Sequence, residues 1–424
     1  MPIVVVLGAT GAGKSKLALE VAQKFGGEII SADAMQMYKG LDIVTNKVSA
    51  EEQRLVKHHM IDFLDPLLKS NVVDFRNQAL PIIQELQKRN VMPVICGGTN
   101  YYIESLLWNI LVQEKITLEP VAKKSKLEEK QSNEDENMSN EELYEKLKSV
   151  DPTRAQELHP NERRKILRSL QVFKTEGKPH SEILKAQKLD GKGGPLGGGL
   201  RFPLEDLAIL WVQCDQNILD ERCDKRVDKM IAAGLVDEMG EFHKTVNEQR
   251  GANPDYTVGI FQSIGFKEFH DYLLLSTEEK CDAKGQKCFD LGKAQMMLAT
   301  RQYARRQTKW IRQRFLRSDR QCPPVYALDS TDPKLWHSQV YQPAVDLLEA
   351  WIAQEDLSRF QALPVNQQAH SFEDSRKMFY CDVCSLHLKG RLSFEAHTKS
   401  RKHYNVKKKF NRGEHPKEQP QPSS

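Results

Sequence analysis

Gly8-Ala9-Thr10-Gly11-Ala12-Gly13-Lys14-Ser15 is the stretch that decides the fold of this chain. It follows the apolar run Ile3–Leu7 and precedes a helical pattern over residues 16–25. A strand, a glycine-rich loop and a helix in this order predict a P-loop, in which backbone N–H groups and the helix dipole hold a diphosphate. Lys14 would neutralise terminal phosphate oxygens, and the Ser15 hydroxyl would join the coordination of Mg²⁺. The sequence therefore predicts a site for a ligand that carries a diphosphate.

Size and composition describe a globular protein of several domains. The 424 residues are enough for two or three domains, and 39% of them are hydrophobic. No apolar run approaches the ~18 residues that a membrane span requires. Because the first strand begins at residue 3, no signal or transit peptide is expected before it. We expect a cytoplasmic and also nuclear protein, mitochondrial only if a longer form carries a presequence. Reduced thiols are expected, in the absence of a disulfide spacing, at Cys96, Cys214, Cys223, Cys281, Cys288 and Cys322.

Residues 1–112 alternate between strand-like and helix-like patterns, which predicts an α/β domain with a parallel sheet. A short strand over residues 28–31 leads to Asp33, and an apolar strand over residues 91–96 leads to Gly97-Gly98-Thr99. Parallel sheets bind their ligands at the carboxyl ends of the strands. Both stretches are therefore expected on the same edge as the P-loop, where a substrate should bind.

A helical insertion is expected over residues 113–200. It begins with a polar segment at 123–142, contains helical patterns over 141–150 and 161–176, and ends in a glycine-rich return. Asn161 is the expected N-cap of the second helix and Gly177 its stop. The remaining boundaries are predicted as a P-loop domain at 1–112 and 201–353, a linker at 354–378, a zinc finger at 379–405 and a basic disordered tail at 406–424.

The carboxyl-terminal module is defined by Cys381-x2-Cys384-x12-His397-x5-His403. Two thiolates and two imidazoles at this spacing predict a tetrahedral, structural Zn²⁺ site. Residues 379–412 contain nine Lys or Arg and two acidic residues, which suits a nucleic-acid backbone. A solvated basic tail and a nuclear localisation signal are the alternatives.

Residues 300–315 form a further basic pattern, with six Lys or Arg and no acid on a helical period. A single basic helix is usually a solvated face. Together with the basic start of the helix at 161–176 and the basic finger, however, it favours a polyanionic partner larger than a nucleotide.

Five stretches in this order resemble the tRNA dimethylallyltransferase (tRNA isopentenyltransferase) family in its eukaryotic form, with the resemblance covering about residues 3–350. They are Gly8–Ser15, Ser31–Tyr38, Gly97–Tyr102, Gln262–Phe266 and Thr300–Trp310. Ala34 departs from many relatives, which have serine at that position. The resemblance implies an α/β P-loop NTPase-like sheet with a helical insertion and a C-terminal C2H2-type finger.

The implied reaction transfers a dimethylallyl group from dimethylallyl diphosphate to N6 of adenosine 37 of tRNA. Asp33 matches the carboxylate that would accept the N6 proton. Leaving-group charge would be met by Lys14, by Ser15 with catalytic Mg²⁺, by the loop amides and Thr10, and by an arginine that the sequence does not choose. The implied diphosphate contacts are Thr10, Gly11, Ala12, Gly13, Lys14 and Ser15, with Arg222 or Arg226, and Arg301 or Arg305, as candidates.

The implied RNA partner is the anticodon stem-loop of tRNA, bound by a monomer with no membrane contact. The residues that the resemblance assigns to tRNA are Asp33, Ala34, Met35, Gln36, Thr99, Pro160, Asn161, Glu162, Arg163, Arg164, Arg168, Gln262, Ser263 and Ile264.

Two other functions fit the P-loop: a nucleotide or small-molecule kinase, and a non-catalytic RNA-binding protein. Binding of dimethylallyl diphosphate without ATP hydrolysis would distinguish the transferase from the kinase. Label transfer into tRNA would distinguish it from the non-catalytic RNA-binding protein.

Overall fold

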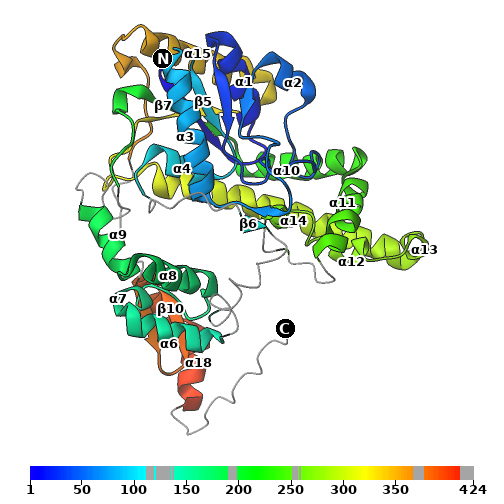
Figure 1. Cartoon of the computed structure of the whole chain (residues 1–424), viewed down its shortest axis with the longest axis vertical. Helices are drawn as coiled ribbons and strands as arrows, with labels where there is room; N and C mark the ends of the chain where they lie inside the picture. Colours follow the sequence, from blue (N-terminus) through cyan, green and yellow to red (C-terminus); the bar gives the residue numbers. More distant parts are fainter. Residues whose placement is uncertain are drawn as a thin grey trace. The chain divides into compact units, whose positions relative to one another are not determined.

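The computed structural model describes residues 1–110, 119–120, 135, 138–189, 198–250, 256, 259–365 and 377–410. The chain divides into two compact units, and each is described by itself. The core unit comprises Met1–Lys123 and Gly199–Asn366, and the accessory unit comprises Lys124–Gly198 and Gln367–Ser424. Figure 1 shows the elements of both units along the chain.

The core unit is built on a six-stranded sheet in the order β3-β2-β5-β1-β7-β8, and every pairing in it is parallel. This confirms the predicted α/β fold with a parallel sheet. β1 lies between β5 and β7, so that Val4 pairs with Val94 on one side and with Ala208 on the other. The strands are β1 (Ile3–Gly8), β2 (Glu28–Ser31), β3 (His58–His59), β5 (Pro93–Cys96), β7 (Leu207–Gln213) and β8 (Val325–Asp329). A separate antiparallel pair joins β4 (Leu68–Lys69) to β6 (Glu119–Pro120).

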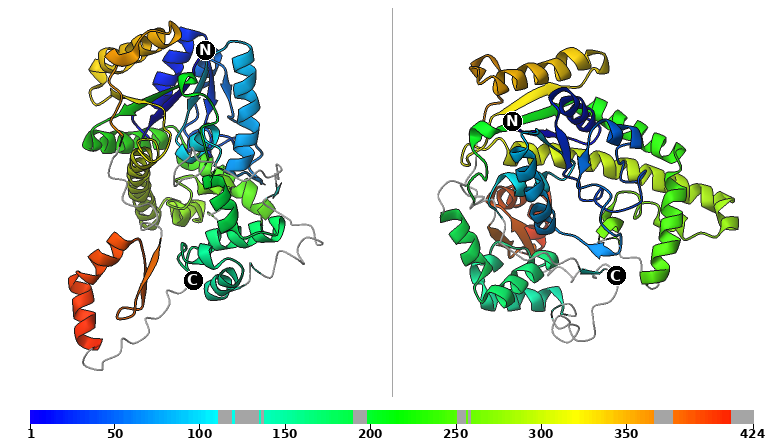
Figure 2. Two further views of the ribbon diagram at one scale, coloured as in Figure 1. Left: turned by 90° about the vertical axis from the view of Figure 1, so that its left-hand side faces the viewer. Right: turned by 45° about the horizontal axis from the view of Figure 1, so that its top comes forward.

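Both faces of the sheet are covered by helices, as Figure 2 shows for α3 on one side and α1 and α15 on the other. Alternate residues of β1 pack into two hydrophobic cores, one on each face of the sheet. Val5 packs in the cluster that contains α3 and α4, and Val6 packs in the cluster that contains α1 and α15. Burial on both faces explains why this strand is continuously apolar. The helices are α1 (Lys14–Phe25), α2 (Ala50–Leu55), α3 (Val72–Lys88), α4 (Asn100–Leu107) and α15 (Gln342–Ile352).

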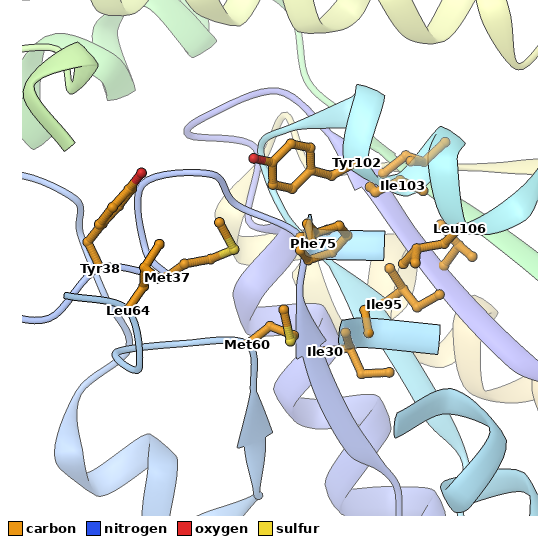
Figure 3. Close-up of a cluster of buried hydrophobic side chains, with 14 of the residues drawn as sticks. Ile30, Met37, Tyr38, Met60, Leu64, Phe75, Ile95, Tyr102, Ile103 and Leu106 are labelled. Carbon is orange, nitrogen blue, oxygen red and sulfur yellow. The ribbon is translucent and has the colours of Figure 1, made fainter. Parts of the chain in front are cut away.

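One part of the core anchors the loop that follows β2 (Figure 3). Phe75 of α3 stacks on Tyr102 of α4 with ring centroids 4.4 Å apart. Met37 and Tyr38, which lie in the loop after β2, are buried in the same cluster. Burial of these two side chains fixes the chain immediately after Asp33.

The second half of the core unit is mostly helical, and its longest helix is α14 (Ala283–Arg314). It lies against α10 and also contacts β1 and α4. Asp282 caps α14 by accepting a hydrogen bond from the Gly285 N–H. The other α-helices are α10 (Gln216–Ala232), α11 (Leu235–Arg250), α12 (His270–Leu273) and α13 (Thr277–Lys280). The short 3-10 helices are η2 (Leu204–Asp206), η3 (Gly259–Gln262), η4 (Pro333–Leu335) and η6 (Leu357–Arg359), and η5 (His337–Tyr341) is a π-helix.

The accessory unit contains a small helical core and the finger. Leu143 and Leu147 of α6 pack against Ile166 and Leu170 of α8. Its helices are α6 (Asn140–Val150), α7 (Pro152–Ala155), α8 (Arg163–Glu176) and α9 (His180–Leu189), and the finger comprises β9 (Met378–Cys381), β10 (Leu386–Lys389), α17 (Arg391–Thr398) and α18 (Arg401–Phe410).

Three expected helix starts differ from those observed: α1 begins at Lys14 rather than residue 16, α6 at Asn140 rather than residue 141, and α8 at Arg163 rather than residue 161. Gly177 ends α8 in the left-handed conformation, as predicted. The expected N-cap Asn161 is wrong, because the N-cap of α8 is the next residue, Glu162. Glu162 instead turns back to accept a hydrogen bond from the His159 N–H at 2.9 Å, and Asn161 N–H donates to His159 Nδ1 at 3.0 Å.

Two expected boundaries also differ. Residues 354–365, predicted as linker, return to the sheet: Leu363 N–H donates to the Val325 carbonyl at 2.8 Å, and Ala362 bridges Tyr326. The edge strand β8 accepts these residues because its outer side has no neighbouring strand. Residues 406–410, predicted as tail, complete α18. The glycine-rich return at 191–197 and the polar residues at 121–134 lie outside the described residues.

The cysteines form no disulfide: all eight are free, as the spacing predicts for the six outside the finger. Across the described part of the chain, no helix combines the length and apolar character that crossing a membrane would need.

A buried ion pair joins α4 to the segment after α14. Glu104 and Arg320 are fully buried, with their side chains 2.7 Å apart, and Arg320 lies 3.7 Å from the centre of the Trp108 ring. Burial lowers the pKa of Arg320, and the Glu104 carboxylate opposes that effect.

We expect Glu104→Gln to lower the free energy of unfolding of the core unit by about 3–5 kcal/mol, because it leaves the Arg320 charge buried without a counterion. Urea unfolding of the full chain measures the change. Glu349→Gln removes the exposed partner of Lys24 and should change stability by less than about 0.5 kcal/mol. Equal effects of the two substitutions would contradict the expectation.

Candidate active site

Three loops meet at the carboxyl edge of the sheet, one after each of the strands β1, β2 and β5. The loops after β2 and β5 are joined by the Thr99 N–H, which donates to the Ala32 carbonyl at 3.0 Å, and by the Ala34 N–H, which donates to Thr99 Oγ1 at 3.0 Å. A Cβ at Gly97 would lie 2.2 Å from the Ala32 carbonyl oxygen, so only glycine permits this approach. Asp33 is thereby held beside Gly98.

The P-loop has the backbone that its glycines predict. Gly11 and Gly13 adopt positive φ angles of 87° and 100°, a region that favours glycine. A Cβ at Gly13 would lie 2.7 Å from the Trp336 ring. Trp336 covers the outer side of the loop, with Lys16 Nζ 4.3 Å from its ring centre and its indole N–H donating to Glu20 at 2.8 Å. The loop is therefore supported from outside as well as by β1.

Two cations and one carboxylate face one another inside this edge. Lys14 is buried, and its Nζ donates to the Ala9 carbonyl at 2.9 Å. Burial lowers the pKa of Lys14, Arg226 on α10 lowers it further, and Asp33 acts in the opposite direction. Burial likewise lowers the pKa of Arg226. Desolvated cations of this kind gain most when an anion joins them.

The site consists of two adjoining cavities. A narrow cavity of about 80 Å³ is lined by Lys14, Ser15 and Gly98, and a wider cavity of about 350 Å³ extends beside it. Thr10, Asp33, Thr45 and Arg226 line both. The wider cavity has apolar walls formed by Met35, Val44, Val227, Met230, Ile264 and Met296. The arrangement suits a ligand with an anionic end and a hydrocarbon end, with Asp33 and Arg226 at the junction.

Known proteins match the chain in both units. Residues 36–314 match the family described as IPP transferase, and residues 379–403 match the zinc-finger of C2H2 type. The mouse tRNA dimethylallyltransferase is 46% identical over 421 residues, covering 97% of this chain and 87% of the mouse chain. The human tRNA dimethylallyltransferase is 45% identical with the same coverage. A crystal structure of a eukaryotic dimethylallyltransferase acting on tRNA is similar with a TM-score of 0.75 and 26% identity, covering 97% of each chain.

This chain belongs to the IPP transferase family.

The four candidate arginines of this IPP transferase occupy different surroundings. Arg226 lines both cavities. Arg222 instead donates to the carbonyls of Ser330 and Thr331, at 2.7 and 3.0 Å. Arg301 and Arg305 pair with acidic residues of α10, Asp224 and Asp220 respectively. Of the four candidates, Arg226 is therefore the one that the structure places at both cavities.

Half of the basic pattern at 300–315 has a different explanation from the one expected. Arg301 and Arg305 bind α10, and Arg314 pairs with the buried Glu104 at 3.0 Å. Three of its six cations thus hold α14 in the core unit. The pattern by itself did not reveal this because the acidic partners come from distant parts of the sequence.

Most of the residues that the resemblance assigned to tRNA in the core unit gather around Asp33. Gln36 lines the narrow cavity, and its side-chain amide donates to the carbonyls of Thr45 and Asn46 at 3.2 and 3.0 Å. The wider cavity is lined by Ala34, Met35, Thr99, Gln262, Ser263 and Ile264.

The remaining assigned residues form a corner at the start of α8 in the accessory unit. Arg163 binds the Met138 carbonyl at 2.6 Å and Asn140 Oδ1 at 3.2 Å, and so holds α8 to the start of α6.

Burial favours the neutral form of Glu162, but hydrogen bonds from Lys165 and the His159 N–H, together with Lys389, lower its pKa to about 2. Lys389 of the finger lies 3.3 Å from Glu162. Pro160 and Arg168 are partly exposed, whereas Asn161 and Arg164 are exposed.

The finger brings its four predicted ligands together. The candidate ligand atoms of Cys381, Cys384, His397 and His403 all lie within 4.8 Å of one another. His403 Nδ1 is 3.5 Å from the first sulfur and 3.4 Å from the second. Two thiolates and two imidazoles at this separation fit a tetrahedral zinc ion.

Two residues of α14, to which the sequence pattern assigned no role, have contacts at the site. Tyr303 and Gln307 both donate to the Gly98 carbonyl, at 3.0 and 2.7 Å. Their spacing of four residues places them on the same face of the helix. That spacing was readable in the sequence, but the loop that they bind was not.

We expect one zinc ion per chain, measured by mass spectrometry of the purified protein. Cys384→Ser should remove it, because structural zinc needs all four ligands and its binding contributes on the order of 10 kcal/mol or more to folding. Cys322→Ser, which changes a free thiol of the core unit, should retain the metal. Zinc retained after Cys384→Ser would place the metal elsewhere.

Proposed function

We propose that the protein transfers the dimethylallyl group of dimethylallyl diphosphate to N6 of adenosine 37 in tRNA. The products are N6-isopentenyladenosine and diphosphate. The observation that carries this proposal is the junction, at Asp33 and Arg226, of a narrow cavity lined by Lys14 and Ser15 with a wider cavity that has apolar walls. The tRNA dimethylallyltransferases of mouse and human, to which the chain is similar over most of its length, support the choice of both substrates.

The leaving group is held by the narrow cavity. Lys14 and Arg226 would neutralise the charge that accumulates on diphosphate when the allylic C–O bond breaks. The positive end of α1 adds to their effect. Ser15 lines this cavity and offers the hydroxyl ligand that Mg²⁺ accepts. Bound Mg²⁺ would supply further charge neutralisation to the diphosphate oxygens.

Asp33 serves the other half of the reaction. The N6 amine attacks the allylic carbon, so that a C–N bond forms as the C–O bond breaks, and the N6 proton passes to the Asp33 carboxylate. One oxygen of Asp33 already accepts the Met35 N–H at 3.0 Å, which holds the carboxylate in place. The base must leave the anticodon-loop stack to reach it. Apolar walls around the allylic group would exclude water, which would otherwise hydrolyse the substrate.

The accessory unit serves the RNA. The exposed cation Arg164 and the basic residues of the finger suit phosphate contacts, which set affinity and its dependence on salt. Zinc has a structural role in this arrangement, because the finger hairpin carries Lys389, the residue that pairs with the corner at Glu162.

The deciding experiment incubates the full chain with labelled dimethylallyl diphosphate, Mg²⁺ and total tRNA. The expected result is label in N6-prenylated adenosine after digestion. Consumption of ATP with no label in RNA would favour a kinase, and tRNA binding with neither activity would favour a non-catalytic RNA-binding protein.

Asp33→Asn should leave the dissociation constant for tRNA nearly unchanged and reduce kcat by at least ~10²-fold, because the amide cannot accept the N6 proton. Single-turnover label transfer and tRNA binding measure the two effects. Asp65→Asn is a matched control, since Asp65 accepts a loop N–H in the same way, from Leu67 at 2.8 Å, outside both cavities. Near-normal turnover of the Asp33 variant would reject this role.

Diphosphate affinity should depend on pH through Lys14. The anion binds the protonated amine, and burial lowers the pKa of Lys14 below its usual 10.5. Affinity is therefore complete below the lowered pKa and falls as the pH rises through it. Lys14→Arg, with a guanidinium that stays protonated, should flatten this fall. Calorimetric titration of inorganic diphosphate between about pH 7 and pH 10 measures it, and identical profiles for both proteins would contradict the assignment.

A further inference from the structure

Gln307 is a buried polar side chain just behind the site, and it has no part in the chemistry described above. It lies on α14 with 3% of its surface exposed. Neither cavity is lined by it, so it stands behind the wall of the site. Tyr303, one turn earlier on the same helix, lines the wider cavity.

The amide of Gln307 joins two of the three loops. Its Oε1 accepts a hydrogen bond from the Thr10 N–H at 2.7 Å, and its Nε2 donates to the Gly98 carbonyl at 2.7 Å. Its own backbone carbonyl accepts from Asn100 Nδ2 at 3.3 Å. The Thr10 N–H is thus committed to Gln307 and is not one of the loop amides that face a diphosphate.

Asp33 is packed against the same bridge. A Cβ at Gly98 would lie 2.9 Å from Asp33 Oδ2 and 3.0 Å from Gln307 Nε2, so Gly98 is enclosed between the carboxylate and the amide. One side chain therefore touches the loop that holds the leaving group and the loop beside the proton acceptor. Few other side chains could do this, because it requires an acceptor and a donor at the end of one chain of fixed length.

The spacing of these two loops matters to the reaction. The diphosphate and the carboxylate act on opposite sides of one allylic carbon, and a displacement of about 1 Å in such a site costs roughly 10²-fold in rate. β1 and β5 are neighbours in the sheet, which fixes where the loops begin. Past the strand ends, glycines make up much of both loops, so a contact from another element has to fix their separation.

We propose that Gln307 is a positioning residue that holds the phosphate cradle and the Asp33 side of the cavity at the separation that dimethylallyl transfer requires. This inference rests on the proposed function. Gln307 acts through Thr10 and Gly98 and touches neither substrate.

Gln307→Glu keeps the hydrogen bond to the Thr10 loop and removes the hydrogen bond to the Gly98 loop. One carboxylate oxygen still accepts the Thr10 N–H, whereas the other faces the Gly98 carbonyl and repels it. When the glutamate is protonated, its O–H donates to that carbonyl and the bridge is restored. The titratable groups packed around Gly98 together with Gln307 are Asp33 and Tyr303, and Cys223 Sγ lies 3.6 Å from the Thr10 carbonyl. The cations that act on Asp33 or Tyr303 are Lys14, Arg226 and Arg306. All are present in the unsubstituted protein, whose own pH profile is the reference.

The expected result for Gln307→Glu is a kcat reduced roughly 10- to 100-fold at about pH 8. The ratio to the unsubstituted rate should rise toward one as the pH falls to about 6. The dissociation constants for inorganic diphosphate and for tRNA should change by less than about threefold, because the cradle contact to Thr10 remains. The measurements are single-turnover label transfer by the full chain with Mg²⁺ across this pH range, together with the two binding titrations.

Gln302→Glu is the matched control, because Gln302 is exposed on the same helix and the substitution adds the same charge. It should leave kcat and its pH profile unchanged. Gln307→Asn provides a second variant whose shorter amide reaches only one of the two loops, and it should lower kcat with no recovery at low pH.

Three outcomes would overturn the positioning role. The first is an unchanged kcat in Gln307→Glu. The second is a kcat that is lowered equally at every pH and in proportion to a loss of folded protein. The third is failure of both Gln307 variants to fold. Unchanged kcat would leave Gln307 without a role in the reaction, and the other two outcomes would leave it with a role in stability alone. A protein with unsubstituted Gln307 that transfers no label into tRNA would instead reject the proposed function, so the two failures are distinguishable.

Discussion

The parallel pairing of β1 with β5 on one side and β7 on the other is the constraint on which the site depends. Backbone hydrogen bonds along both edges of β1 fix where the P-loop begins, relative to the loops that follow its neighbours. Apolar side chains on both faces of β1 exclude water from these bonds and make them persistent. Because the strands are parallel, their carboxyl ends and the polar loops that follow them are gathered at one edge. A buried strand thus brings Lys14, Asp33 and Gly98 together.

Electrostatics at this edge prepares the site for an anion. Lys14 and Arg226 are desolvated, and the carboxylate of Asp33 offsets only part of their charge. In the proposed reaction, a diphosphate would gain charge-assisted hydrogen bonds from these cations with little rearrangement, since the loop is already held by Gln307 and Trp336. The same cations would stabilise the leaving group more strongly than the intact substrate, and that difference is what accelerates a reaction.

Basic residues in this chain have two separate duties. On α14, Arg301, Arg305 and Arg314 are paired with acids of the core unit and hold the helix that carries Tyr303 and Gln307. In the accessory unit, part of the positive charge stays exposed, and Lys389 links the finger hairpin to Glu162 at the corner of α8. A charge count therefore overstates the surface that is free for RNA, whereas the ion pairs show which cations are committed to the fold.

The sequence by itself determined the parallel α/β fold, the P-loop, the four zinc ligands and the placement of Asp33 at the strand ends. These four features can be predicted because the patterns that indicate them, apolar runs, glycine spacing and ligand spacing, each lie within a short stretch of the chain. Only the tertiary structure decided which arginine faces the cavity, that half of the basic pattern at 300–315 is bound within the core unit, and that Gln307 bridges two loops. Asp224, Glu104 and Gly98 are separated from their partners by about 80 to 210 residues, and no local pattern records such distant partners. Their contacts exist only after helix and sheet have packed.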